Sequence, residues 1–218
     1  MPAVVFDWDG TLVDTIPAIY RANVETLAEY GVAFDEDAYR ATYAPDWRVM
    51  YHRMGLPEAA IAEAGDRWLA RYEASDGARP FPGAGLALER LAGAGYRMGI
   101  VTAGHRHVVE AQLEAFGFEV HIDAMVCGDD GLPAKPDPTP LLRVLEDLRA
   151  LPGGRPAEGC AYVGDVPDDM RLARAAGVLG VGIVSVLGTA DELTAAGAGR
   201  VVASVAEWVD ELLAGRGA

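Results

Sequence analysis

The sequence predicts an α/β fold: a Rossmann-like parallel sheet with helices on both faces, plus an inserted α-helical cap domain. The first observation is that short apolar runs, each followed by turn residues, alternate with amphipathic stretches of helical period. The second is that residues 16–77 break this alternation, because the segment is aromatic-rich and helical in pattern throughout. We therefore expect a core domain formed by residues 1–15 and 78–218, and a cap domain formed by residues 16–77.

Five apolar runs are predicted to be buried strands. They span residues 4–6, 98–101, 124–127, 161–163 and 181–184. Helical periodicity between these runs predicts helices at residues 84–94, 107–116, 140–148 and 170–176. Val201 and Val202, followed by the segment VAEWVDELL, predict a short edge strand and a terminal helix.

The inserted segment is expected to consist of several helices. Gly31, Gly55 and Gly65 punctuate it, and Pro57 follows closely after the second of these glycines. Because glycine and proline are unfavourable inside a helix, we predict that these positions separate the helices.

Composition limits the partners that the chain can have. It has 218 residues and a net charge of -15, which argues against a nucleic-acid partner because phosphate backbones are bound by clustered Lys and Arg. No window approaches the roughly 18 uncharged apolar residues of a membrane span, and the N-terminus has no basic and apolar leader. We therefore expect no membrane partner and a cytoplasmic location. Cys127 and Cys160 lie in or beside apolar runs, so they are predicted to be buried reduced thiols.

Acidic side chains follow two of the predicted strands, at the sheet edge where ligands of parallel sheets bind. Asp7 and Asp9 follow the first strand, and Asp165 follows the fourth. Three carboxylates at one edge would repel one another and raise their pKa values unless a divalent cation lay among them. Oxygen ligands favour a hard ion, so the sequence predicts Mg²⁺ here, with Asp169 placed to hold a metal-bound water.

Two further residues suit the binding of a phosphoryl group. Thr102 follows the second predicted strand, and a helix is expected to start soon after it. Its hydroxyl and the free main-chain N–H groups at that helix start are predicted to form a phosphate-binding site. Lys135 is the only lysine among 18 basic residues, and it offers a compact positive charge. Taken singly, each candidate could be a turn, cap or solvated loop residue. Their convergence on one sheet edge predicts phosphoryl transfer instead.

Four longer motifs lie on these strands and loops. They are DWDGTLVDT at residues 7–15, FPGAGLALERLAGAGYRMGIVTAG at residues 81–104, AKPDP at residues 134–138 and VGDVPDDMRLARAAG at residues 163–177. These motifs resemble the haloacid dehalogenase-like hydrolase superfamily, specifically its phosphoglycolate phosphatase-like branch, which has a helical cap inserted after the first strand. The resemblance covers nearly the whole chain. Dehalogenases of the superfamily lack an aspartate at the position of Asp9, so dehalogenation is disfavoured.

The resemblance implies how the phosphoryl group is handled. Asp7 would be the nucleophile that becomes an aspartyl phosphate, and Asp9 would be the general acid and base. Thr102 and Lys135 would hold the phosphoryl group. Ala103 stands where many relatives place Asn, so its contact with the substrate is expected to differ from theirs.

The resemblance also implies a set of metal ligands. Asp165 would join Asp7 and the main-chain carbonyl of Asp9 on Mg²⁺, and Asp169 would support the metal shell. Val166 stands where many relatives place Ser, but this departure removes no core catalytic group.

The predicted cap offers weaker candidates. Arg48, within Asp46-Trp47-Arg48, would suit a substrate carboxylate such as that of phosphoglycolate, and His52 and Arg53 are further candidates for contacting the leaving group. An arginine on a cap helix is more often a solvated or ion-paired surface residue, and both readings stay open here.

The sequence therefore predicts a Mg²⁺-dependent phosphatase, monomeric or homodimeric, acting on a small phosphate ester, with phosphoglycolate as the modal substrate. A sugar-phosphate mutase of the same branch is the main alternative. From other classes, a phospho-acceptor signalling domain would share the acidic cluster, the Thr and the Lys but is shorter and has no inserted cap. A non-catalytic binding protein would show no metal-dependent turnover.

Overall fold

The computed structural model of the chain describes residues 2–75 and 77–215. Internal contacts divide the chain into two compact units, Met1–Val13 with Pro80–Ala218 and Asp14–Arg79. We call the first the core unit and the second the inserted unit. The short strands β2 (Val13–Asp14) and β3 (Arg79–Pro80) lie where the chain passes between the units, and they pair in a two-stranded sheet.

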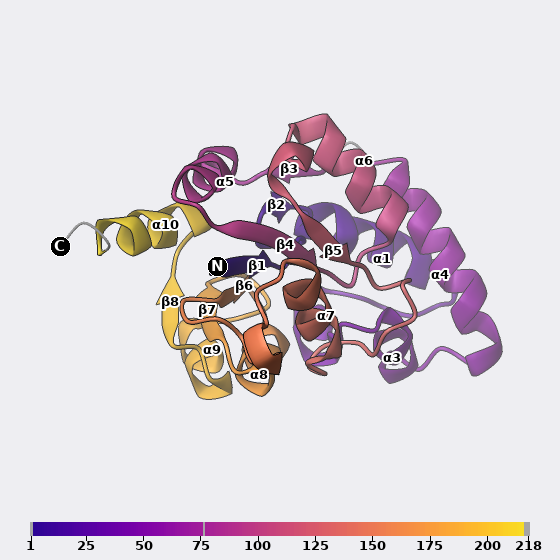
Figure 1. The fold of residues 1–218 in the computed structure, drawn as a ribbon. Helices are drawn as coiled ribbons and strands as arrows, with labels where there is room; N and C mark the ends of the chain where they lie inside the picture. The colour runs from indigo at the N-terminus through magenta and orange to yellow at the C-terminus, as the bar shows by residue number, and fades with distance from the viewer. Residues whose placement is uncertain (1, 76, 216–218) are drawn as a thin grey trace. The chain divides into compact units, whose positions relative to one another are not determined.

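The core unit is built on a six-stranded sheet in which all neighbouring strands are parallel (Figure 1). Its order is β5-β4-β1-β6-β7-β8, which places β1 inside the sheet. Phe6 at the end of β1 is in register with Ile100 of β4 and Val163 of β6, so the carboxyl ends of these strands lie together. The strand bounds are β1 Ala3–Phe6, β4 Arg97–Val101, β5 Ala124–Val126, β6 Ala161–Gly164, β7 Leu179–Ile183 and β8 Arg200–Val202.

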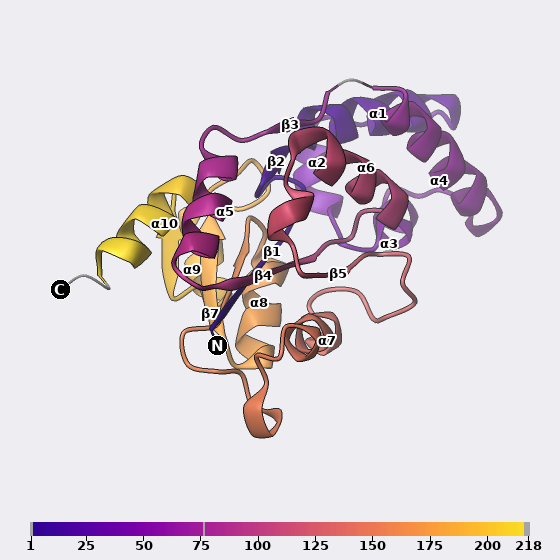
Figure 2. The same ribbon diagram turned by 45° about the horizontal axis from the view of Figure 1, so that its top comes forward.

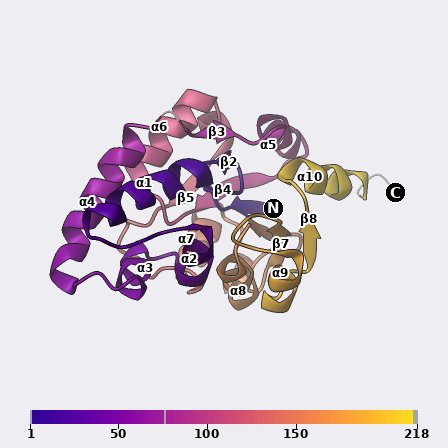
Figure 3. The same cartoon turned by 180° about the vertical axis from the view of Figure 1, so that it is seen from behind.

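Helices cover both faces of this sheet (Figures 1 and 3). The helices α5, α6 and α10 lie on one face and α7, α8 and α9 on the other. Right-handed crossovers between parallel strands require this placement for α5 to α9, and α10, which follows the last strand, packs against α5. Their bounds are α5 Ala84–Gly93, α6 Arg106–Phe116, α7 Thr139–Asp147, α8 Pro167–Ala176, α9 Ala190–Ala196 and α10 Val205–Ala214, with short 3₁₀ turns η1 Glu119–His121 and η2 Pro152–Gly154.

Burial on two faces explains the composition of the central strand. All four residues of β1 are buried, so its sequence is an uninterrupted apolar run and not an alternating one. Val5 packs in one apolar cluster with Leu141 of α7 and Leu172 of α8. This packing supports the strand end on which the first motif begins.

In its described residues, 14–75 and 77–79, the inserted unit forms four helices, α1 Ile16–Glu29, α2 Glu36–Thr42, α3 Trp47–Arg53 and α4 Glu58–Glu73. Within it, α1 and α4 lie side by side (Figure 2). Arg67 and Arg71 of α4 both form ion pairs with Glu29 of α1. Ion pairs as exposed as these add only modestly to stability.

The predicted helix boundary at Gly65 is wrong, because Gly65 lies inside α4. A Cβ atom at this position would overlap the ring of Trp47 from α3. The missing side chain therefore lets α3 pack closely against α4, and the helical hydrogen bonds continue through the glycine. Gly31 and Gly55 do lie between helices, each with positive φ.

The predicted fold class is confirmed, and the predicted strands of the sheet are present. Helix α8 begins at Pro167, three residues earlier than expected, because proline is well suited to the first turn of a helix. Helix α9, which has only 7 residues, was not predicted from the sequence. Its signal was the capping box of Thr189 and Glu192, in which each side chain meets the other's main-chain N–H.

None of the helices in the described part of the chain is long and apolar enough to cross a membrane.

Candidate active site

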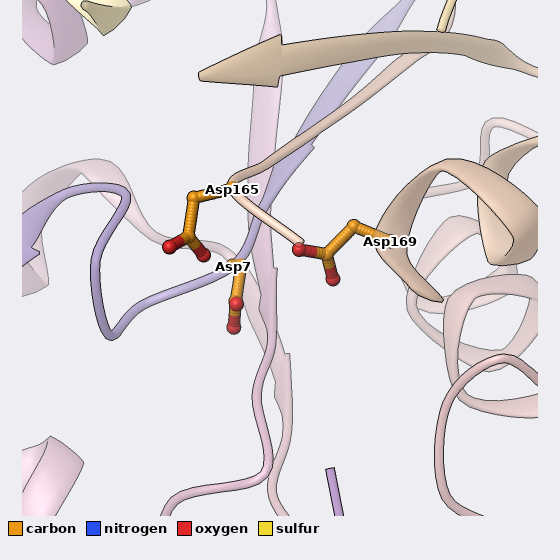
Figure 4. A group of neighbouring side chains, drawn as sticks. All are labelled: Asp7, Asp165 and Asp169. Carbon is orange, nitrogen blue, oxygen red and sulfur yellow. The ribbon is translucent and has the colours of Figure 1, made fainter. Parts of the chain in front are cut away.

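Three aspartates meet at the carboxyl ends of the central strands (Figure 4). Asp7 follows β1, Asp165 follows β6, and Asp169 lies in the first turn of α8. Their exposed fractions are 5%, 1% and 0%. One carboxylate oxygen from each lies within 4.8 Å of the others. The parallel register of β1 and β6 brings together residues that are far apart in the sequence.

Lys135 joins two of these carboxylates. Its Nζ lies 2.8 Å from Oδ1 of Asp7 and 2.8 Å from Oδ1 of Asp169. The side chain is buried, although Ala134 and Pro136 on either side are exposed. The loop after β5 therefore directs the only lysine of the chain inward, where its charge is shared by two acidic groups.

Asp169 is held on both of its oxygens. Oδ1 faces Lys135, and Oδ2 accepts a 3.0 Å hydrogen bond from the main-chain N–H of Val166. The hydroxyl of Tyr162 lies 2.9 Å from the carbonyl oxygen of Val101 and 3.3 Å from Oδ1 of Asp169, and its one proton can serve one acceptor at a time. Sequence reasoning missed Tyr162. Its only signal was a hydroxyl within an otherwise apolar strand.

The turn after Asp7 depends on Gly10. This residue has a φ of 78°, and a Cβ atom there would lie 2.5 Å from Oδ2 of Asp165. Glycine both adopts the left-handed conformation and leaves room for the carboxylate. Immediately before Gly10, Oδ2 of Asp9 lies 3.5 Å from Oγ1 of Thr102, so the second aspartate of the motif faces the loop that follows β4.

The prediction of free main-chain N–H groups at a helix start directly after Thr102 needs correction. Helix α6 begins only at Arg106, and the N–H of Gly104 is not free, because it donates a 3.0 Å hydrogen bond to Oγ1 of Thr102. A threonine side chain at a strand end readily closes such a local turn. The Ala103 side chain is exposed. The main chain of Gly128 packs closely against Ala103, so that a side chain at position 128 would not fit.

The acidic cluster has strongly shifted protonation equilibria. Burial raises the pKa of Asp7 from 3.8 to about 7, while the ammonium of Lys135 opposes that rise. The charges of Asp169 and Asp9 raise the pKa of Asp7 further. Burial likewise holds the pKa of Asp165 well above its usual range, with Asp7 and Asp169 adding to the shift. One ammonium is therefore insufficient to balance the carboxylates when all are ionised.

The residues present fit a divalent cation. Oδ2 of Asp165 is buried and has no hydrogen-bond partner among the described residues. Leaving a carboxylate oxygen buried and unpaired is unfavourable, and a cation at this point would remove that cost. The donor set is entirely oxygen, which suits a hard ion such as Mg²⁺ better than a soft metal.

Arg48 belongs to the inserted unit. Its guanidinium lies 4.5 Å from the ring centroid of Trp47 and 3.7 Å from the carboxylate of Asp46, and 65% of its side chain is exposed. Stacking on Trp47 leaves donors of the guanidinium available at the surface. Its contact with a substrate stays a prediction. Cys127 and Cys160 are both free and buried, as expected.

Comparisons with known proteins agree with this geometry. Residues 4–183 match the family model described as haloacid dehalogenase-like hydrolase. A phosphoglycolate phosphatase of Rhodospirillum rubrum is 35% identical over 189 residues, which cover 81% of this chain and 76% of the relative. A hydrolase from Pseudomonas syringae has a similar solved structure, with a TM-score of 0.84, 25% identity, and coverage of 97% and 98% of the two chains.

A candidate β-phosphoglucomutase from Thermotoga maritima is also similar. Its structure gives a TM-score of 0.74 at 26% identity and covers 98% of this chain and 99% of that chain. The family model and the curated relative together carry the assignment. The chain belongs to the haloacid dehalogenase-like hydrolase family, in its phosphoglycolate phosphatase-like branch, and is a hydrolase of the phosphatase class.

Proposed function

We propose that this chain is a Mg²⁺-dependent phosphatase that transfers a phosphoryl group from a small phosphate monoester to Asp7 and then to water. The observation that carries this proposal is the arrangement of charge around Asp7. Lys135 is shared between Asp7 and Asp169 at 2.8 Å from each, while Oδ2 of the neighbouring Asp165 is buried without a partner. A cation and a phosphoryl group would complete this arrangement.

Asp7 and Asp165 would hold the cation through their carboxylates, and Asp9 would do so through its main-chain carbonyl. Asp169 would support this shell from the first turn of α8, where it also fixes Lys135. When bound, Mg²⁺ supplies positive charge that offsets both the carboxylates and the phosphate oxygens.

The chain's own residues account for the group transfer. A carboxylate oxygen of Asp7 forms a bond to phosphorus while the bond from phosphorus to the ester oxygen breaks, and Asp9 donates a proton to that oxygen. Asp9 then takes a proton from a water molecule that attacks the aspartyl phosphate, which releases inorganic phosphate and restores Asp7. Lys135 and the hydroxyl of Thr102 stabilise the charge that develops on the phosphoryl oxygens.

Phosphoglycolate is the first substrate to test, because the curated relative is named a phosphoglycolate phosphatase. In this proposal the inserted unit acts as a cap that selects the substrate and excludes water during transfer. The exposed guanidinium of Arg48 would bind the substrate carboxylate. A cytoplasmic location and a monomeric or homodimeric state stay predictions.

A hydrolysis screen tests the proposal. The protein is incubated with Mg²⁺ and a panel of phosphate esters, including phosphoglycolate and hexose phosphates, beside Asp7→Asn and the matched control Asp168→Asn. Asp168 is on the same helix turn as Asp169, but its side chain is partly exposed and pairs with Arg171. We expect phosphate release from the wild type and Asp168→Asn, and none from Asp7→Asn. Full activity of Asp7→Asn, or the absence of phosphate release by the wild type from every ester, would refute the proposal.

A sugar-phosphate mutase is the second candidate, favoured by the similarity to the candidate β-phosphoglucomutase. A mutase would return the phosphoryl group to the sugar and not to water. In the same screen it would convert a hexose phosphate to its isomer with little release of inorganic phosphate, so product identity separates the two functions.

A further inference from the structure

Trp8 lies between the two aspartates of the first motif and is fully buried. Its indole Nε1–H donates a 2.6 Å hydrogen bond to Oε1 of Gln112, which lies on α6. Its ring meets the ring of Phe118 edge-on, with 6.3 Å between the centroids. A buried indole N–H requires an acceptor, and Gln112 provides it across 104 residues of sequence.

The main chain of Trp8 organises the loop that carries the nucleophile. Its N–H donates a 2.8 Å hydrogen bond to Oδ1 of Asp7, the same oxygen that faces Lys135. Its carbonyl oxygen accepts hydrogen bonds of 3.1 Å from the N–H groups of both Leu12 and Val13. Any displacement of Trp8 would therefore move the Asp7 carboxylate and the turn that follows it together.

Helix α6 connects this loop to a second part of the site. The helix follows the Thr102 loop in the sequence, and Oγ1 of Thr102 lies 3.5 Å from Oδ2 of Asp9. Gln112 is six residues beyond Arg106, the first residue of α6, which corresponds to about 9 Å along the helix axis. One rigid helix thus sets the separation between the Thr102 loop and the Trp8 indole.

We propose that Gln112 is a positioning residue. Through its hydrogen bond to Trp8, it holds the loop after β1, which carries Asp7, in a fixed position relative to the loop after β4, which carries Thr102. This role rests on the proposed function, because it concerns turnover at Asp7. Loss of the bond would leave the indole N–H unpaired and let the Asp7 loop shift. A shift of the reacting oxygen lowers kcat, whereas the groups that bind the ground-state substrate are retained and KM changes little.

The test compares two substitutions at Gln112. Gln112→Leu removes the acceptor and is expected to lower kcat by about tenfold or more, with KM within about twofold of the wild type. Gln112→Glu retains an acceptor oxygen at the same chain length and is expected to keep kcat within about threefold. Rescue by the acceptor-bearing variant separates the hydrogen bond from simple side-chain volume.

A double-mutant cycle asks whether Gln112 acts through Trp8. Trp8→Phe keeps an aromatic ring but removes the indole donor. We expect Gln112→Leu to have no further effect on kcat in the Trp8→Phe background, because the bond is already absent. The indole N–H signal of Trp8, identified in NMR spectra by its loss in Trp8→Phe, should exchange with solvent faster in Gln112→Leu.

Ser204→Ala is the matched control for a general loss of stability. Ser204 caps α10 by accepting a 3.1 Å hydrogen bond from the N–H of Glu207, in the same unit but apart from the acidic cluster. It should lower the Tm without changing kcat.

The outcomes distinguish this role from the proposed function. If the wild type turns over phosphate esters and Gln112→Leu keeps the wild-type kcat, the positioning role is overturned and the phosphatase function stands. If Gln112→Leu does not fold, a wild-type kcat in Trp8→Phe overturns the role equally well. Absence of turnover by the wild type would overturn both.

Discussion

At the residue scale, the site depends on one ammonium among several buried carboxylates. Lys135 faces Asp7 and Asp169, and its side chain is 5% exposed. A buried charge pair adds little net stability by itself, but removing one partner leaves the other charge uncompensated. The same group is proposed to stabilise the phosphoryl oxygens, so its loss should affect both folding and turnover.

Substitution Lys135→Met tests this double dependence. We expect kcat with the best ester of the screen to fall by about 10²–10³-fold, the size of effect seen when one transition-state donor is removed. The free energy of unfolding in the absence of metal should also fall. The matched control is Arg143→Met, because Arg143 is exposed and forms an ion pair with Asp147. Equal activity of the two variants would contradict the role of Lys135.

The raised pKa of Asp7 predicts how stability depends on pH. In the folded, metal-free protein this pKa is about 7, above its usual 3.8. The folded state therefore holds the proton more tightly than the unfolded state, and this contribution to stability is complete below about pH 4 and lost as the pH rises through about 7. Mg²⁺ binds the ionised carboxylates, so it should offset the loss.

Urea unfolding in EDTA and in Mg²⁺ at about pH 5 and pH 8 measures this effect. We expect Mg²⁺ to increase the free energy of unfolding more at the higher pH, and to do so much less in Asp165→Asn, which lacks one ionisable ligand. A Mg²⁺ effect that is absent, or larger at the lower pH, would contradict the proposed cation site.

The residues at the strand ends could be identified from the sequence, because buried strands are recognised as short apolar runs and the residues that follow parallel strands must meet at one sheet edge. The side chains that contact these strand-end residues could not be identified in this way. Tyr162 lies in an apolar run, and its sequence position does not indicate that its hydroxyl contacts Asp169. Gln112 lies on an amphipathic helix, and its sequence position does not indicate a hydrogen bond with Trp8. Such contacts depend on the exact placement of elements that are distant in sequence.

At the element scale, Gly65 illustrates the limit of local propensity. Glycine is a poor helix former, and that property alone predicts a boundary. The packing of α3 on α4 outweighs it, because only glycine leaves space for Trp47. The strands were predicted from short apolar runs bounded by turn residues, and the longer crossover helices from apolar residues that recur over several turns. Helix α9 has only 7 residues, which is too short to show a period.

Substitution Gly65→Ala tests this explanation. Alanine improves helix propensity by about 1 kcal/mol, but overpacking costs about 1–3 kcal/mol, so we expect a net loss of stability. The control is Gly93→Ala at the end of α5, where a Cβ atom would meet nothing within 4 Å. That change should be neutral or stabilising. Chemical denaturation followed by near-ultraviolet circular dichroism measures both, and a stabilised Gly65→Ala would refute the packing argument.

At the scale of the whole molecule, the negative net charge of the chain contrasts with the positive charge that an anion-binding site requires. The chain carries a net charge of -15, yet it is proposed to bind an anionic ester. In this proposal, the local positive charge for that task comes from Lys135 and from a cation bound at the acidic cluster. All the acidic residues of this cluster lie in the core unit, so the proposed chemistry belongs to that unit.

The covalent intermediate on Asp7 is the central claim, and acid-quench peptide mapping tests it most directly. The protein is mixed with Mg²⁺ and its best ester, quenched in acid during turnover and digested, and the peptides are weighed by mass spectrometry. We predict one phosphoryl group on the peptide that contains Asp7 in the wild type, and none in Asp7→Asn. Turnover of the wild type without any phosphoryl group on Asp7 would contradict the account.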